Sequence, residues 1–303
     1  MPKLHVNPNH QSNLALWLAL AAGVVLGGAV VVSRYAYDGG ASGIVVATVR
    51  SIIMTLAVGV GLRIAGFALT VPRSMMGLAM FNGALMAIMT YGNIGAVEFI
   101  SVGLTSLLFF TFPIIIAVLV IAFGMEHIRP AKLLTVIVAF LGLAIMLGAS
   151  LGKVDGRGTT FALTAACATA VNAILVMKYF RETNVFVATL HFSFWGFFVL
   201  VLIASTVAEV RLPTTTTGWA GVLGVGVLQT IGTPMYLYAI TRIGALKAGM
   251  ATNIQPVVAI ALAWILFGET LSVAQALGGG LVLTAVATMQ WLDLRRLTIT
   301  STP

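Results

Sequence analysis

Polar side chains stand inside several otherwise apolar stretches of the chain, at spacings that place them on one face of a helix. Two such sets are Asn82, Met86, Met89 and Asn93, and Gln229, Thr233 and Tyr236. Amide, hydroxyl, phenol and thioether groups carry no net charge. Together they are suited to bind a neutral or zwitterionic solute. The alternative interpretation is that these groups form hydrogen bonds between neighbouring helices.

Two prolines in the middle of apolar stretches mark a second set of candidates. Pro113 and Pro256 lie 143 positions apart within similar segments, 96–126 and 239–269. Proline lacks an N–H, so the carbonyl four residues earlier loses its helical partner. Freed carbonyls at membrane depth need a protein or water partner, and they could bind a solute or serve as flexible points. We therefore expect both prolines to be hinges, next to these further substrate-binding candidates: Phe109, Phe112, Thr252 and Gln255.

Three more polar residues fall within apolar stretches. Arg50 could anchor a carboxylate, and His191 could titrate. Both lie near enough to a segment end for the side chain to extend to the membrane surface instead. Asn172 is a further buried amide, which either faces a cavity or bonds to another helix.

The acidic residues are all expected in loops or at segment ends: Asp38, Glu98, Glu126, Asp155, Glu182, Glu209, Glu269 and Asp293. A carboxylate within a span, which many ion-coupled carriers use as a relay, is therefore absent from the pattern. Paired catalytic carboxylates, a metal-ligand cluster and a glycine-rich phosphate loop are absent too. These absences argue against an enzyme, and we expect no cofactor and no bound metal.

The composition is that of a membrane protein. Of 303 residues, 60% are hydrophobic and 8% are charged, whereas soluble domains average roughly 45–50% and 25%. About 20 apolar residues form one helical span. The chain contains ten such segments, at about 14–33, 44–62, 74–95, 99–123, 131–149, 158–177, 186–208, 218–240, 243–267 and 273–292. In the first, Gly23-x-x-x-Gly27 predicts close approach by another helix.

The segments repeat. A shift of 143 positions places each of the first five on one of the last five, so we predict two repeats, 14–149 and 158–292. An odd number of spans per repeat requires the second to enter the membrane inverted, with a substrate site between the repeats at the midplane. The fold class expected is all-α and polytopic, with ten transmembrane helices as two inverted five-helix repeats.

The net charge of +8 is spread singly between apolar segments, which favours a topological role over nucleic-acid binding. With the amino terminus inside, the cytoplasmic segments hold 11 of the 16 Lys and Arg residues and the outer loops hold 4, while Arg50 lies within a span. The excess of positive charge on one side predicts that both termini are cytoplasmic.

The two proline segments resemble the EamA domain of the drug/metabolite transporter superfamily. The second copy carries Gln255-Pro256 and, after the apolar run, Phe267-Gly268-Glu269 followed by Gln275 and Gly278. The first carries Phe112-Pro113 and Gly124-Met125-Glu126, where Met125 splits the Gly-Glu pair. The resemblance implies a ten-helix carrier of the bacterial inner membrane, often an exporter of amino acids or other metabolites.

We therefore expect a transporter that moves a small organic solute, an amino acid or a similar neutral or zwitterionic metabolite, by alternating access through a midplane cavity. The alternative is a broad-specificity exporter of drugs or amphipathic cations. The expected partners are the solute and the lipid bilayer, with no nucleic acid. The chain is expected to act as a monomer or a homodimer.

Overall fold

The computed structural model describes residues 8–97, 99–125, 128–148, 155–206, 209–268 and 270–300; for residues 8–10, 290 and 293–300 only the backbone is described. Glu98, Glu126 and Glu269 lie outside these ranges. The described residues form helices and no strand. The helices are α1 (Pro8–Asp38), α2 (Gly43–Ile64), α3 (Arg73–Val97), α4 (Val102–Phe109), α5 (Phe112–Ala122), α6 (Pro130–Met146), α7 (Gly156–Tyr179), α8 (Val185–Thr206), α9 (Thr216–Ile243), α10 (Ala245–Thr252), α11 (Ile254–Phe267) and α12 (Val273–Thr300).

Eight helical segments of the described chain are long and apolar enough to cross a membrane, and two of them, Val102–Ala122 and Ala245–Phe267, each comprise two of these helices. Two shorter apolar helical stretches, Pro130–Met146 and Val273–Met289, fall below this length. The all-helical, multi-pass class predicted from the sequence is confirmed. The count of ten spans and their inverted arrangement stay predictions.

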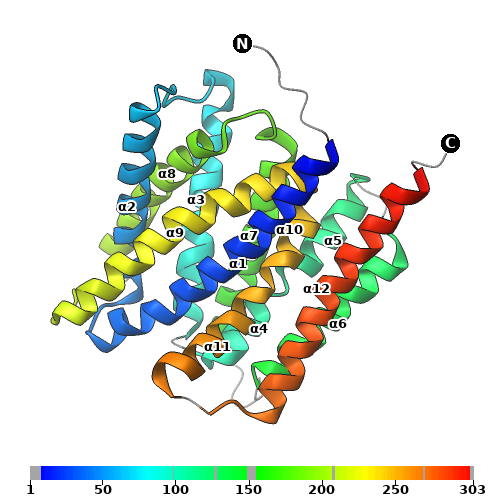
Figure 1. The fold of residues 1–303 in the computed structure, drawn as a ribbon. Helices are drawn as coiled ribbons and strands as arrows, with labels where there is room; N and C mark the ends of the chain where they lie inside the picture. Colours follow the sequence, from blue (N-terminus) through cyan, green and yellow to red (C-terminus); the bar gives the residue numbers. More distant parts are fainter. Residues whose placement is uncertain are drawn as a thin grey trace.

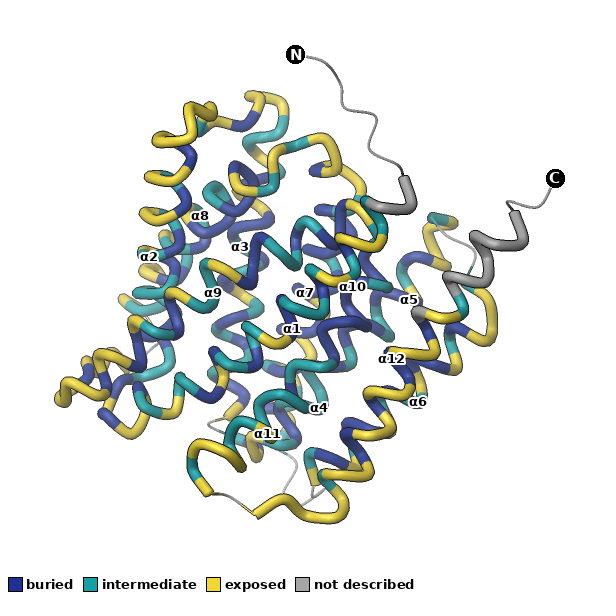
Figure 2. The backbone as a smooth tube through the Cα atoms, viewed as in Figure 1, coloured by how far each residue is buried: buried dark blue, intermediate teal, exposed yellow. Residues whose placement is uncertain are grey.

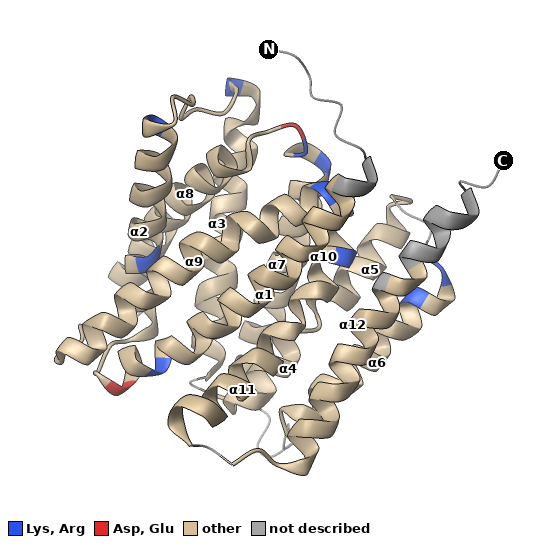
Figure 3. Cartoon of the chain, viewed as in Figure 1, with Lys and Arg blue, Asp and Glu red and all other residues tan. Residues whose placement is uncertain are grey.

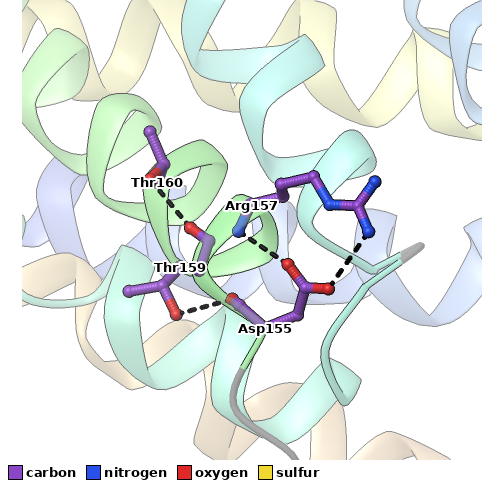
Figure 4. A network of polar contacts seen from close by, with 5 residues as sticks. Asp155, Arg157, Thr159 and Thr160 are labelled. Atoms are coloured by element: carbon purple, nitrogen blue, oxygen red, sulfur yellow. Dashed lines mark hydrogen bonds and ion pairs between the residues drawn. The ribbon is translucent and has the colours of Figure 1, made fainter.

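The helix ends follow local rules. Ser101 and Thr215 are N-cap residues whose hydroxyl oxygens accept hydrogen bonds from Leu104 N (3.2 Å) and Gly218 N (3.0 Å), which satisfies backbone donors that have no helical partner. Asp155 caps α7 by accepting from Arg157 N at 2.7 Å, and its other oxygen lies 3.4 Å from the Arg157 guanidinium (Figure 4). Such caps mark the first residues of α4, α7 and α9.

The helices pack in pairs drawn from the two halves of the chain. α1 lies along α9, and α3 lies along α7. α2 contacts both α8 and α9, α8 also contacts α3, and α6 pairs with α12 (Figure 1). Figure 2 shows exposed residues along α12, and the burial pattern places exposed residues at intervals along α6 as well, as expected for helices that face lipid.

Glycines permit the closest of these contacts. The predicted approach at Gly23 and Gly27 is confirmed: a Cβ on Gly27 would lie 2.6 Å from the Gln255 carbonyl oxygen, and one on Gly23 would lie 2.4 Å from the Ile254 side chain. At the α6–α12 contact, a Cβ on Gly278 would lie 2.5 Å from the Gly142 carbonyl oxygen. These small residues let the helix backbones approach closely. Close packing matters here because the hydrophobic effect does not drive helices together in lipid.

Candidate substrate-binding site

Two apolar segments are each interrupted by a break between two helices, and a proline follows in the first turn after each break. α4 ends at Phe109 and α5 begins at Phe112, next to Pro113, while α10 ends at Thr252 and α11 begins at Ile254, two residues before Pro256. Both prolines are buried. The sequence therefore located both interruptions.

The two breaks share one backbone geometry. Thr111 N donates to Leu108 O at 3.2 Å, and Asn253 N donates to Met250 O at 3.1 Å. Both bonds span three residues instead of four, so the chain tightens into a short 3₁₀-like turn at each break. A tight turn replaces the hydrogen bonds that a continuous helix would have made. Whether either turn flexes stays a prediction.

The polar side chains at the breaks differ in how far they are satisfied. Thr252, a predicted binding residue, is 3% exposed, and its hydroxyl donates to Gly249 O at 2.8 Å. Asn253 is 2% exposed, and its Oδ1 has no hydrogen-bond partner among the described residues. Gln255 is half-buried on α11. The sequence placed Thr252 and Gln255 among the candidates but missed Asn253, although an amide beside a proline break was a usable signal.

Aromatic rings line the first break. The Phe109 ring centroid lies 5.4 Å from that of Phe110 and 5.6 Å from that of Phe112. Phe112 is buried and packs against Gly249 of α10, where a Cβ would lie 3.0 Å from its ring. This contact joins the region of one break to the helix that leads into the other. Phe109 and Phe112, both predicted binding residues, are thus neighbours.

The predicted stripes on α3 and α9 reach the same apolar cluster. Met86, Phe109 and Tyr236 are half-buried and pack against the central core cluster, which includes Phe112. The Tyr236 hydroxyl is buried without a hydrogen-bond partner in the described part of the chain. Gln229 Oε1 accepts from the Thr233 hydroxyl at 3.4 Å, so these two residues contact each other along α9.

Asn82 and Asn172 bond to each other across the α3–α7 contact. Asn172 Nδ2 donates to Asn82 Oδ1 at 2.9 Å, and Asn82 Nδ2 donates to Leu78 O at 2.9 Å. Both residues are buried. Of the two roles left open by the sequence, this geometry is that of an interhelical hydrogen bond. Asn93, further along α3, is half-buried.

Arg50 and His191 have different surroundings. Arg50 donates through Nη2 to the Thr90 hydroxyl on α3, so it bonds to a neighbouring helix. His191 Nε2 lies 3.0 Å from Leu69 O and 3.3 Å from Val71 N, so its ring bonds to the backbone of the connection between α2 and α3. That contact lies at a segment end, which matches the interpretation that the His191 side chain extends toward the membrane surface.

Other polar contacts were not foreseen from the sequence. The Thr55 hydroxyl donates to Ser193 Oγ at 2.9 Å between α2 and α8. Thr105 Oγ1 on α4 and Trp195 Nε1 on α8 are buried without a hydrogen-bond partner among the residues described. Single hydroxyl groups in apolar helices carry no sequence signal that separates helix contacts from ligand contacts.

Charge lies mostly at the ends of the helices (Figure 3). At one such end, the backbone hydrogen bond from Arg157 lowers the pKa of the Asp155 carboxyl below its ordinary value, and the neighbouring guanidinium acts in the same direction. Within the described ranges, no group of three His, Cys, Asp or Glu residues could hold a metal ion.

Comparison with known proteins gives a consistent result. Residues 156–290 match the EamA-like transporter family. The uncharacterized transporter YdfC of Bacillus subtilis (strain 168) is 27% identical over 190 residues, which is 62% of this chain and 61% of that protein. The aligned part therefore spans less than two thirds of the relative.

A solved structure has the same fold. It superimposes with a TM-score of 0.77 over 92% of this chain and 98% of its own, at 17% sequence identity. At this identity the likeness concerns the fold alone.

Proposed function

We propose that this multi-pass membrane protein is a carrier for a small organic solute. The proposal starts from the match of residues 156–290 to the EamA-like transporter family, which belongs to the drug/metabolite transporter superfamily, and from the similarity to a bacterial transporter. The observation that carries the proposal is the pair of interrupted apolar segments, each with a tight turn just before a proline. Backbone that leaves the helical pattern inside a membrane is tolerated where it is buried in protein or lines a cavity. Discontinuous helices are a common site of solute binding in carriers.

The proposed mechanism is alternating access between two inverted repeats, 14–149 and 158–292. The packing supports this arrangement. If α1, α2, α3 and α6 correspond to α7, α8, α9 and α12, then the α1–α9 contact corresponds to α7–α3, and α2–α9 corresponds to α8–α3. The α2–α8 and α6–α12 contacts each map onto themselves. This pattern is what a pseudo-twofold axis between the halves would produce.

The solute is proposed to be neutral or zwitterionic, such as an amino acid, and to leave the cell. The side chains gathered at the breaks and on α3 and α9 are amides, hydroxyls, aromatic rings and a thioether. The candidate membrane spans of the described chain contain one carboxylate, Asp38, which is the last residue of α1. A broad exporter of amphipathic cations remains the second candidate, and an intramembrane carboxylate would have favoured it.

The setting proposed is the bacterial inner membrane, with both termini in the cytoplasm. α1 begins and α12 ends at the same end of the helix bundle (Figure 1), and most Lys and Arg residues lie near that end (Figure 3). A positively charged cytoplasmic face is the usual arrangement. The carrier is proposed to act as a monomer or a homodimer, without a cofactor and without enzymatic activity.

The proposal is tested by flux measurements on purified protein in liposomes. Vesicles would be offered a panel of labelled amino acids, other metabolites and cationic dyes, against protein-free vesicles. At least one neutral or zwitterionic solute should enter with saturable kinetics. The variants Gln229→Ala and Tyr236→Phe should alter those kinetics. Thr284→Ala, on the exposed side of α12, should leave them unchanged. The absence of flux for every solute, with correctly folded protein, would contradict the proposal.

A further inference from the structure

The Arg50 guanidinium bonds sideways to the neighbouring helix. Arg50 lies seven residues into α2, which begins at Gly43, and thus about 10 Å along the helix at ~1.5 Å per residue. Its partner Thr90 lies seven residues before Val97, where α3 ends. The two residues are therefore at similar depth. The side chain does not extend along α2 toward the surface, which was the simpler interpretation of its sequence position.

No carboxylate neutralises this charge in the part of the chain that the structure describes. Among the described residues, Asp38, Asp155 and Glu209 lie near the same end, and each pairs with another arginine: Arg34 at 3.7 Å, Arg157 at 3.4 Å and Arg211 at 3.5 Å, respectively. A guanidinium has five N–H donors, and Thr90 is the hydrogen-bond partner that the described residues supply. Arg50 as a whole residue is half-buried.

Thr90 cannot compensate for the charge. Its hydroxyl accepts from Arg50 and donates to Met86 O at 2.8 Å. The Met86 carbonyl is neutral, and Arg50 is the cation that needs to be balanced, so neither hydrogen bond supplies negative charge. A charged side chain inside a membrane is costly, and such residues usually mark a substrate path, a relay or a counter-ion for a ligand. The described residues around Arg50 thus supply no anion that balances its charge, and a ligand could supply one.

We propose that Arg50 and Thr90 bind the carboxylate of the transported solute, an inference that rests on the proposed carrier function. The planar guanidinium presents two parallel N–H groups that match the two oxygens of a carboxylate. Thr90 belongs to the α3 face that carries Met86 and Asn93. The body of the solute would therefore lie against the uncharged stripe.

The number of charges selects the kind of anion. One arginine balances the single charge of a carboxylate. A phosphate monoester carries nearly two charges at neutral pH, and the other described arginines near this end, Arg34, Arg157 and Arg211, each lie beside a carboxylate. Amino acids are thus the substrate class expected, and small monocarboxylates serve as probes of the same carboxylate contact.

The test compares each acid with the amide that lacks its carboxylate charge. Purified full-length protein in detergent would be heated with neutral amino acids, the corresponding amino-acid amides, small monocarboxylates or inorganic phosphate. A ligand that binds the folded state raises the unfolding temperature according to its affinity. At least one amino acid or monocarboxylate should stabilise the wild type, whereas the amides and phosphate should not. Arg50→Gln should weaken that binding at least about tenfold. Arg63→Gln, at an exposed position near the end of the same helix, should leave it unchanged.

Arg50→Lys and Thr90→Val extend the test to variants that retain the charge or the shape of the site. Both variants should bind the acid more weakly than the wild type does. Without ligand, their unfolding temperatures should stay close to that of the wild type. Equal stabilisation by acids and amides, a preference for phosphate, no response to any acid, or full acid binding by Arg50→Lys and Thr90→Val would each overturn the carboxylate site.

Flux through the same protein in liposomes separates the two proposals. Transport that does not distinguish acids from amides would retain the carrier and overturn the site. Acid binding that depends on Arg50, without flux of any solute, would retain the site and overturn the carrier.

Discussion

Asn172 Nδ2 lies 2.9 Å from Asn82 Oδ1 and joins α7 to α3 through two buried amides. Replacement of Asn172 by Ala would leave the Asn82 oxygen buried without this donor. A buried polar atom that loses its partner costs about 1–3 kcal/mol. We expect Asn172→Ala to lower the free energy of unfolding by this amount, measured by denaturant titration in detergent. A double-mutant cycle with Asn82→Ala should give a coupling energy of about 0.6 kcal/mol or more.

The same variants separate two roles for these amides. An interhelical bond predicts that stability falls while the affinity for solute is retained. A large loss of affinity with unchanged stability would instead return both residues to the binding site. Thr284→Ala, which removes a hydroxyl bonded to its own exposed helix, serves as the control for stability.

Gly278 and Gly280 lie on α12 in different surroundings. A Cβ on Gly278 would meet the backbone of Gly142 and Met146 at 2.5 Å, whereas one on Gly280 would meet nothing within 4 Å. Gly278→Ala should therefore force α6 and α12 apart and destabilise the protein by about 1–3 kcal/mol. Gly280→Ala should be neutral or stabilising by up to about 1 kcal/mol, because alanine favours the helix. Thermal unfolding of the two variants measures the difference. Equal midpoints would contradict the close contact.

The proline breaks should control the rate of transport. Replacing Pro256 by Ala restores an N–H that can bond to the Thr252 carbonyl and extend the helix across the break. If the break flexes during transport, Pro256→Ala should slow flux about tenfold, equivalent to ~1.4 kcal/mol, without impairing membrane insertion. Pro113→Ala should act in the same direction. Pro234 lies inside the continuous helix α9, so Pro234→Ala is the matched control. Unchanged flux in both break variants would exclude a hinge role.

Asp155 should make stability depend on pH in a defined direction. The hydrogen bond from Arg157 N lowers the pKa of its carboxyl in the folded protein. A carboxyl with a lowered folded pKa stabilises the protein at pH values above its unfolded pKa, and this contribution is lost as the pH falls through the folded pKa. The unfolding temperature of Asp155→Ala should therefore fall less between pH 6 and roughly pH 3 than that of the wild type. Parallel curves for the two proteins would contradict this role.

The sequence predicted features that depend on one residue type or on local spacing. Proline chemistry located both breaks, and Gly23 and Gly27 predicted the close approach of another helix, which proved to be α11 and the end of α10. Hydrophobic runs predicted the all-helical membrane class.

Partners distant in sequence could not be predicted in the same way. Asn82 and Asn172 are 90 residues apart, and only the packing of α3 on α7 brings their amides together. The same holds for Arg50 and Thr90, which are 40 residues apart. Sequence alone allows an arginine near a helix end to reach either the surface or a neighbouring helix, because both are within the length of its side chain.

Counterflow in proteoliposomes tests the central claim, that the chain is a carrier, most directly. Vesicles loaded with an unlabelled solute identified by the flux panel would be diluted into a trace of the same solute in labelled form. A carrier that exposes its site alternately to each side will accumulate label transiently above its equilibrium level before the label leaks away. Label that rises steadily to equilibrium, at a rate independent of the internal solute, would indicate a passive channel and contradict the alternating mechanism.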